Sequence, residues 1–122
     1  MKATGAGSTT ARGRLAEQLV ADHLTQQGFI LIARDLRVGR DEVDLLGWDG
    51  ATLVVVEVRS RRAGAMVDPL SSVSRAKQRR LRNALARCMA DHGARDGRID
   101  VASVVGGALV DYLPNAVDYT ET

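Results

Sequence analysis

The sequence is poor in several kinds of residue, and each shortage excludes a class of protein. Its 122 residues include a single cysteine, Cys88, so neither an internal disulfide nor a cluster of thiolate ligands can form. The two histidines, His23 and His92, lie far apart and give no zinc-binding spacing. No apolar run approaches the roughly 18 residues of a membrane-spanning helix. Any bound metal ion must therefore rely mainly on oxygen ligands.

The amino-terminal segment lacks the charged start and apolar run of a secretion signal, so we expect a cytoplasmic protein without a membrane segment. Residues 1–10 are rich in glycine, serine, threonine and alanine, which predicts a disordered leader. Residues 11–117 are expected to form a single domain, followed by a short tail over 118–122. No internal repeat or long linker divides this domain.

Positive charge is unevenly distributed along the chain. The formal net charge is only +2, yet residues 59–87 contain nine basic side chains against one acid, Asp68, a local charge of +8. Fifteen of the seventeen basic residues are arginine, whose planar guanidinium suits bidentate contact with phosphate. A coding bias that replaces lysine with arginine on solvated helices is an alternative explanation of the arginine excess, but it does not explain the clustering.

Apolar periodicity predicts two helices and five strands. Helices are expected over 11–27 and 72–92, and strands over 29–36, 42–48, 51–60, 98–105 and 108–113. Gly28 and Gly93 have the positions of carboxyl-terminal helix caps, and Asp49-Gly50 predicts a type I′ turn. The order αβββαββ indicates an α/β fold in which helices cover the faces of a mixed central sheet.

Glu57 stands at the end of the apolar run Leu53-Val54-Val55-Val56, where a carboxylate is costly unless it is paired, hydrogen-bonded or bound to a cation. Strand alternation places Leu53, Val55, Glu57 and Arg59 on one face of the strand. The other face carries the intervening valines. Glu57 and Arg59 are therefore expected to share one surface.

Asp44 lies on the preceding strand, which the turn at Asp49-Gly50 folds back toward Glu57. A bulge or a divergence of the two strands would bring Asp44 and Glu57 together, although the sequence does not fix the register. Two converging carboxylates repel each other, and such pairs commonly hold a divalent cation. The alternative is a pair of ordinary edge carboxylates that make salt bridges with Arg59 and Arg61.

The spacing of Asp44 and Glu57-Val58-Arg59 resembles the metal-binding signature of the PD-(D/E)xK nuclease superfamily, with arginine in place of the motif lysine. A wider set of landmarks resembles the YraN-like family of uncharacterised bacterial proteins. These landmarks are Gly13-Arg14-Leu15-Ala16-Glu17, Gly28-Phe29, Asp41-Glu42-Val43-Asp44-Leu45-Leu46, Val55-Val56-Glu57-Val58-Arg59-Ser60-Arg61, Lys77, Arg98-Ile99-Asp100-Val101 and Asn115-Ala116. The resemblance implies a restriction-endonuclease-like fold related to Holliday-junction resolvases, and it implies nucleic-acid binding.

The superfamily resemblance implies a role for each matching residue. Asp44, Glu57 and the Val58 carbonyl would bind Mg²⁺ or Mn²⁺, and Glu17 would complete the acidic cluster. Glu17 lies at the edge of its helix's apolar stripe, from which it is expected to reach the rim of the sheet. A solvated glutamate that interacts with the helix dipole is the alternative for Glu17.

Arg59 departs from the motif lysine, because an arginine stays protonated and can only stabilise negative charge. Lys77 lies on the apolar side of the second helix, near the start of that helix. In some members of the superfamily the working lysine has moved to a helix, so the resemblance makes Lys77 the candidate for this role. The alternative is a lysine whose ammonium extends past the apolar stripe to solvent.

The arginines near this site are expected to contact a nucleic-acid backbone. The candidates are Arg61, Arg62, Arg75, Arg79 and Arg80. Because only 3% of the residues are aromatic and none lies among these arginines, duplex or branched DNA is favoured over stacking on single-stranded bases. Resolvase-like chemistry would favour a homodimer. A solvated helix face remains the alternative for each single arginine.

Three functions remain open from the sequence. The first is a metal-dependent, structure-selective DNA endonuclease. The second is a non-catalytic nucleic-acid-binding module with a degenerate nuclease site. The third is an adaptor whose arginine-rich helix binds an acidic protein. Outside the site, Asp100 is expected to have a structural role, paired with Arg98 or with a helix arginine.

Overall fold

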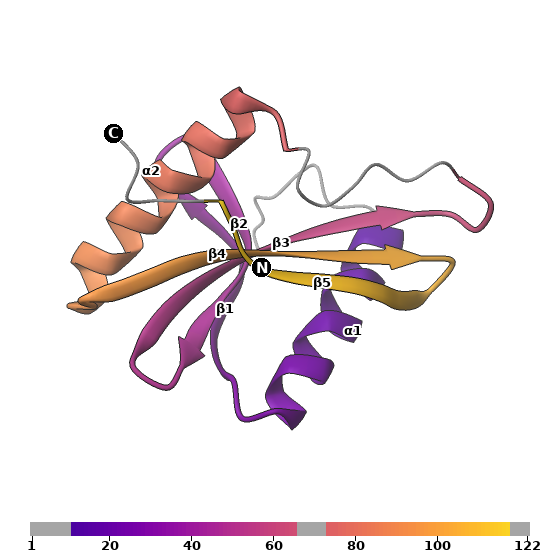
Figure 1. Cartoon of the computed structure of the whole chain (residues 1–122), viewed down its shortest axis with the longest axis horizontal. Coiled ribbons are helices and arrows are strands. Elements are labelled where there is room, and N and C mark those ends of the chain that lie inside the picture. Colours follow the sequence, from indigo (N-terminus) through magenta and orange to yellow (C-terminus); the bar gives the residue numbers. More distant parts are fainter. Residues whose placement is uncertain (1–10, 66–72, 118–122) are drawn as a thin grey trace.

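A computed structural model describes residues 11–65 and 73–117, which form a five-stranded sheet with one helix on each face (Figure 1). The elements, in chain order, are α1 (Ala11–Gln26), β1 (Ile30–Val38), β2 (Asp41–Asp49), β3 (Thr52–Arg61), α2 (Arg75–His92), β4 (Asp96–Val105) and β5 (Ala108–Val117). The predicted α/β class and the order αβββαββ are confirmed. The expected leader and tail lie outside the described residues, as do residues 66–72.

The strands lie in the sheet in the order of the sequence, β1-β2-β3-β4-β5. β3 and β4 are parallel and the other neighbouring strands are antiparallel, so the sheet is mixed as expected. A parallel pair requires a crossover connection, and α2 lies in the connection between β3 and β4. By the strand order β3 is the central strand, and its apolar run Leu53–Val56 is fully buried.

The two faces of the sheet carry separate hydrophobic clusters. Leu53 and Val55 pack in the cluster that contains Leu81 and Leu85 of α2. The opposite cluster joins α1 to the other face of β3 through Ala16, Val20, Leu24, Val54 and Val56. The predicted alternation along β3 is thus confirmed for its apolar part. Among the described helices, none is long and apolar enough to cross a membrane.

α2 begins at Arg75, three residues later than the expected start at residue 72. The Ser74 backbone is extended, and its side chain accepts a hydrogen bond from the Lys77 backbone N–H at 3.2 Å. A serine in this position caps the first turn and so marks the helix start. At the other end Gly93 adopts a left-handed conformation with φ 66°, as its predicted role as a cap requires.

The turn between β2 and β3 differs from the predicted type I′ turn at Asp49-Gly50. Asp49 and Thr52 are paired, so the two turn residues are Gly50 and Ala51. Within the described residues only Asp35 and Asn115 have positive φ apart from glycines, so Ala51 does not have it, whereas Gly50 has φ 62°. A positive φ at the first turn residue alone is the pattern of a type II′ turn, because that position needs a glycine.

β5 continues to Val117, four residues beyond its expected end at Leu113. It contains Pro114, which lacks a backbone N–H and is therefore tolerated in a sheet mainly on an edge strand. β5 is such an edge strand, and its pairing with β4 is interrupted by two register shifts. The loss of an apolar period after Leu113, where the predicted strand ends, thus reflects an irregular edge.

Gly47 lies where β2 passes closest to the start of β1. A Cβ atom at this position would lie 2.5 Å from the Ile30 carbonyl oxygen and closer still to the Phe29 ring. Since Phe29 is buried and the carbonyl belongs to the backbone, neither group can easily move away. The glycine therefore permits this close approach of two strands.

We expect Gly47→Ala to lower the free energy of unfolding by about 1–3 kcal/mol, the usual cost of overpacking. Urea denaturation followed by circular dichroism measures the change. Gly107→Ala is the comparison, because its added Cβ meets no atom within 4 Å and only its positive φ of 82° opposes the substitution. A Gly47→Ala variant as stable as the wild type would show that the close approach at Gly47 has no energetic consequence.

Candidate functional site

Three carboxylates from three elements meet at one side of the sheet. Glu17 of α1, Asp35 of β1 and Asp44 of β2 each offer a carboxylate oxygen, and these oxygens lie within 4.8 Å of one another. A hydrogen bond that protonated Glu17 makes with the Asp35 side chain is one of the causes that raise the pKa of Glu17. Carboxylate oxygens are the preferred ligands of Mg²⁺ and Mn²⁺, so this carboxylate cluster of Glu17, Asp35 and Asp44 is the candidate metal centre.

Asp35 joins the carboxylate cluster through an unusual backbone conformation. Its φ is 48°, in the left-handed region, and it lies between the paired residues Arg34↔Leu45 and Leu36↔Val43 of β1 and β2. Aspartate tolerates this region better than most residues. Asp35 was not predicted from the sequence, because its only signal is one acid within a strand, and periodicity does not reveal a positive φ.

Asp44 is held where the regular pairing of β2 with β3 ends. The last pair of that ladder is Leu45↔Val56. Asp44 and Glu57 are the next residues beyond this pair, one on each strand. The Val58 backbone N–H donates a 2.7 Å hydrogen bond to Asp44 Oδ2. The expected divergence of the two strands thus allows a side chain to take the place of a ladder hydrogen bond. A role for the Val58 carbonyl as a metal ligand remains a prediction.

Burial makes the carboxylate cluster hard to ionise. Burial raises the pKa of Asp44 to about 7, with repulsion from Glu57 adding to the rise and the Val58 hydrogen bond opposing it. Burial also raises the pKa of Glu17 to about 9, with smaller contributions from Asp35 and Asp44. Glu17 is only 5% exposed, which rules out the solvated alternative. The carboxylate cluster therefore favours a bound proton or cation.

One oxygen of this cluster has no protein partner. Glu17 Oε1 is buried and accepts no hydrogen bond within the described part of the chain. A buried acceptor without a partner is costly, and native proteins usually satisfy it with a donor, a water molecule or an ion. This orphaned oxygen fits a ligand position for a divalent cation.

Glu57 points to the other face of the sheet, where it meets α2. Lys77 Nζ lies 2.9 Å from Glu57 Oε2, and the two side chains are 38% and 14% exposed. The structure thus brings the predicted helix lysine to the predicted carboxylate. It also divides the predicted acidic set, because Glu57 pairs with Lys77 whereas Glu17 and Asp44 join Asp35. The charges of Glu57 and Lys77 still act on Asp44, which links the two groups.

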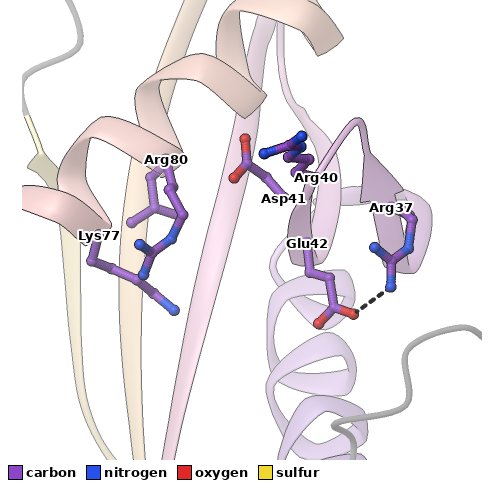
Figure 2. Close-up of a pocket in the computed structure, with 7 residues that line it drawn as sticks. Arg37, Arg40, Asp41, Glu42, Lys77 and Arg80 are labelled. Carbon is purple, nitrogen blue, oxygen red and sulfur yellow. Dashed lines mark hydrogen bonds and ion pairs between the residues drawn. The ribbon is translucent and has the colours of Figure 1, made fainter.

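A polar pocket of about 340 Å³ lies between α2 and the β1–β2 hairpin (Figure 2). The hairpin supplies Arg37, Arg40, Asp41 and Glu42, and α2 supplies Lys77, Arg80 and Leu81. In Figure 2, Lys77 and Arg80 extend from the helix toward the hairpin. The two helix cations were predicted from the sequence, whereas the two hairpin arginines were not, because they lie outside the basic segment 59–87.

The other predicted basic residues lie apart from this pocket. Arg59 and Arg61 are partly buried on β3, and Arg61 Nη1 donates to the Ser60 carbonyl at 3.1 Å. Arg62, which follows β3, is exposed, as are Arg75 and Arg79 in the first turns of α2. The predicted contact of the last four arginines with nucleic acid remains a prediction, and so does the charge-stabilising role predicted for Arg59.

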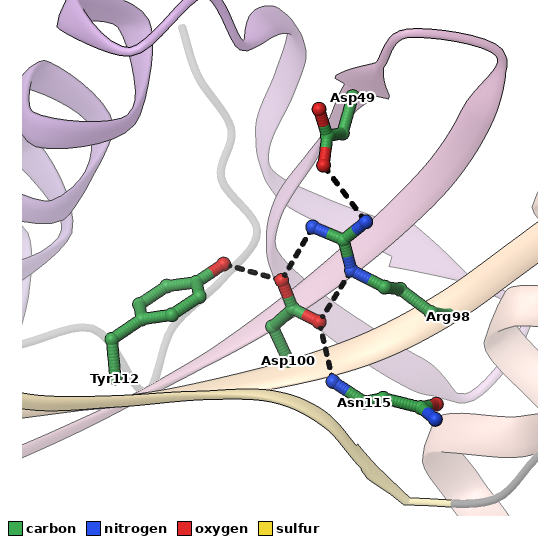
Figure 3. A network of polar contacts seen from close by, with 5 residues as sticks. All are labelled: Asp49, Arg98, Asp100, Tyr112 and Asn115. Atoms are coloured by element: carbon green, nitrogen blue, oxygen red, sulfur yellow. Dashed lines mark hydrogen bonds and ion pairs between the residues drawn. The ribbon is translucent and has the colours of Figure 1, made fainter.

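A second polar network is centred on Asp100 of β4 (Figure 3). The fully buried Asp100 carboxylate accepts hydrogen bonds from Arg98 Nε at 2.9 Å, from Arg98 Nη2 at 3.1 Å and from the Tyr112 hydroxyl at 2.6 Å. The Asn115 backbone N–H donates a fourth at 2.9 Å, and Arg98 also pairs with Asp49 at 2.8 Å. These contacts satisfy the carboxylate within the protein, so the expected structural role of Asp100 is supported.

We expect Glu17→Gln to change how stability depends on pH. A carboxyl whose folded pKa, about 9, exceeds its usual 4.5 makes the protein less stable as pH rises through that interval. In EDTA, the free energy of unfolding of the wild type should therefore fall between about pH 5 and 9. That of the variant should fall less, so that at the upper end the variant is roughly 1–3 kcal/mol more stable than the wild type. Urea denaturation at several pH values measures this.

Asp22→Asn is the control for this experiment, because Asp22 is exposed on the same helix. Its neutralisation should leave the shape of the pH profile unchanged. A Glu17→Gln profile parallel to that of the wild type would show that Glu17 is ionised in the folded protein throughout the range.

Comparisons with known proteins identify relatives along most of the chain. Residues 16–104 match the family described as "Uncharacterised protein family UPF0102". The UPF0102 protein of Marinobacter nauticus is 41% identical over 111 residues, which cover 86% of this chain and 90% of the relative. Those of Sorangium cellulosum and Streptomyces coelicolor are 38% and 41% identical, covering 93% and 78% of this chain and 85% and 76% of the relatives.

A solved structure described as "Structure of EndoMS-dsDNA2 complex" is similar to 70% of this chain, with a TM-score of 0.45 and 20% sequence identity. The similar region is 34% of that longer chain. The family match and the identities of about 40% with several relatives show that the chain belongs to UPF0102, the YraN-like family that its motifs resemble.

Proposed function

We propose that this protein binds nucleic acid and hydrolyses its phosphodiester bonds with the help of Mg²⁺ or Mn²⁺. The observation that carries the proposal is the carboxylate cluster of Glu17, Asp35 and Asp44, whose oxygens lie within 4.8 Å of one another. Within this cluster Glu17 Oε1 is buried and unpartnered. Carboxylates brought this close repel one another unless a proton or a cation lies among them, and a divalent cation compensates more than one of them.

The residues present fit such a cation. All three carboxylates offer the hard oxygen ligands that Mg²⁺ and Mn²⁺ prefer. Glu57, like Asp44, is the first residue of its strand beyond the last β2–β3 pair. Glu17, Asp35 and Asp44 would hold the ion, with Glu57 and the Val58 carbonyl as the further candidates. When bound, the ion would supply Lewis acidity for attack on a phosphodiester.

The neighbouring cations would act on the phosphate. Lys77 is held by its ion pair with Glu57 and its charge acts on Asp44, so its ammonium would stabilise negative charge that develops near the carboxylate cluster. Arg59, on the same strand as Glu57, stays protonated and is suited only to binding charge. Duplex or branched DNA as the substrate, a homodimer as the active form and a cytoplasmic location are further parts of this proposal.

A non-catalytic nucleic-acid-binding module is the second candidate. Two observations favour it: arginine stands at position 59 in place of the motif lysine, and Glu57 is paired with Lys77 rather than placed among the other carboxylates. Such a module would keep the basic surface and bind nucleic acid without cutting it. Binding and cleavage must therefore be measured separately.

The test incubates purified protein with labelled duplex, single-stranded, flap and four-way-junction DNA in Mg²⁺, Mn²⁺ or EDTA. We expect metal-dependent cleavage by the wild type and a loss of about 100-fold or more in Asp44→Asn and Glu17→Gln, because each removes a charged ligand. Asp35→Asn should weaken Mn²⁺ binding, measured by calorimetry, by at least about tenfold. Asp22→Asn, purified in parallel, controls for contaminating nuclease.

The outcomes separate the candidates. Cleavage that survives in Asp44→Asn would come from a contaminant or from another site and would contradict the proposal. Binding in EDTA, without cleavage in either metal, would support the non-catalytic module. If neither binding nor cleavage occurs, the adaptor that binds an acidic protein becomes the leading hypothesis.

A further inference from the structure

The pocket between α2 and the β1–β2 hairpin has more positive than negative charge. Its lining contains four cations, Arg37, Arg40, Lys77 and Arg80, and two acids, Asp41 and Glu42, which leaves an excess of two positive charges. The cations come from two segments far apart in the sequence, and in Figure 2 they flank the same space. Cations from separate elements repel one another in such a space, and an anion between them relieves that repulsion.

The acids of the pocket do not neutralise this excess. Arg37 and Glu42 form a loose ion pair at 3.5 Å with side chains 57% and 33% exposed, a kind of pair that contributes little to stability and can rearrange. Lys77 pairs with Glu57, an acid outside the pocket lining, so the charge of Lys77 is partly compensated and the positive excess rests mainly on Arg40 and Arg80. An incoming anion would therefore meet the exposed guanidinium groups of Arg40 and Arg80.

The pocket has the size and chemistry for a phosphate group. About 340 Å³ is at the lower end of the range for small-ligand sites, enough for a phosphate with part of an attached sugar. Arginine suits phosphate, because its planar fork donates two hydrogen bonds to two phosphate oxygens. Lys77 belongs to the first turn of α2, where the helix dipole also favours negative charge. Buried Leu81 gives the pocket an apolar wall.

Lys77 connects this pocket to the carboxylate cluster. Its side chain lines the pocket and also reaches Glu57 at 2.9 Å, while the charges of both residues act on Asp44. From the hairpin side, β2 runs directly from Asp41 and Glu42 of the pocket to Asp44 of the cluster. A phosphate in the pocket would thus be a close neighbour of a phosphodiester at the carboxylates.

We propose that the pocket formed by Arg37, Arg40, Lys77 and Arg80 binds a backbone phosphate of a nucleic-acid strand and so positions the adjacent part of that strand at the carboxylate cluster. This inference rests on the proposed nucleic-acid-binding function and adds the hairpin arginines to the contact surface. It thereby extends the expected phosphate path, which included Arg61 and Arg62 at the end of β3, to the β1–β2 hairpin.

The test measures binding of labelled duplex and four-way-junction DNA by fluorescence anisotropy in EDTA, over a range of salt concentrations. We expect Arg40→Ala and Arg80→Ala each to weaken binding roughly three- to tenfold and to reduce the salt dependence by about one phosphate contact. Arg95→Ala is the matched control, because Arg95 is exposed and lies outside this pocket, just before β4. It should bind within about twofold of the wild type.

A second arm distinguishes a backbone phosphate from a free phosphate compound. Inorganic phosphate and a mononucleotide are titrated into the full-length protein, and amide NMR shifts are followed at Arg40, Asp41 and Arg80. Weak, saturable shifts that Arg40→Ala abolishes, together with much tighter DNA binding, are expected. The proposal that the pocket binds a backbone phosphate would be overturned if the mononucleotide bound as tightly as DNA and Arg40→Ala weakened only the binding of the mononucleotide.

The failure of this inference is distinguishable from the failure of the proposed function. If the wild type binds DNA but Arg40→Ala, Arg80→Ala and Arg95→Ala are all equal, the pocket inference is wrong and the function stands. Equal losses in Arg79→Ala and Arg80→Ala with no effect of Arg40→Ala would show that a diffuse helix face binds DNA, and would also overturn it. If the wild type binds no nucleic acid, the proposed function fails, and so does the backbone assignment.

Discussion

The burial of Asp44 between two groups of charges is the constraint on which the rest of the site depends. On one side are Glu17 and Asp35, which share a hydrogen bond, and on the other are Glu57 and Lys77, which form an ion pair. The Val58 N–H fixes Asp44 between them. Ionising a carboxylate in this position costs free energy, because it is buried near other acids. The same geometry makes the site favourable for a positive charge. The fold stabilises the arrangement through two apolar clusters, one on each face.

The two faces of the sheet have different roles at this site. α1 brings an acid to one face, whereas α2 brings a cation to the other, and β2 ends its pairing with β3 between them. On the acidic side Glu17 is only 5% exposed, whereas Asp35 and Asp44 are partly exposed, and the basic side opens into the pocket lined by Arg40 and Arg80. A negatively charged polymer would approach from the basic side, where its charge is matched, and meet the carboxylates at the edge of that surface.

Much of this arrangement could be predicted from the sequence, because it follows from patterns with a fixed period. The apolar run Leu53–Val56 predicted a central buried strand, and strand alternation placed Glu57 on the face that proved to hold α2. The helical stripe placed Lys77 near the site. What could not be predicted depends on irregular backbone and on contacts between distant segments. Asp35 enters the site through a positive φ within a strand, and Arg40 reaches α2 only because the hairpin folds beside it.

The irregularities in the two outer strands also affect how the protein behaves toward other copies of itself. β1 and β5 form the edges of the sheet and expose apolar side chains, with Ile30 at 62% and Val110 at 57% exposure. A straight edge with such side chains can add a strand from another molecule and begin aggregation. The register shift in β1 and the left-handed Asp35 make one edge irregular, while the shifts in β5 and Pro114 interrupt the other. The distortion that brings Asp35 into the site therefore also protects the sheet against uncontrolled growth.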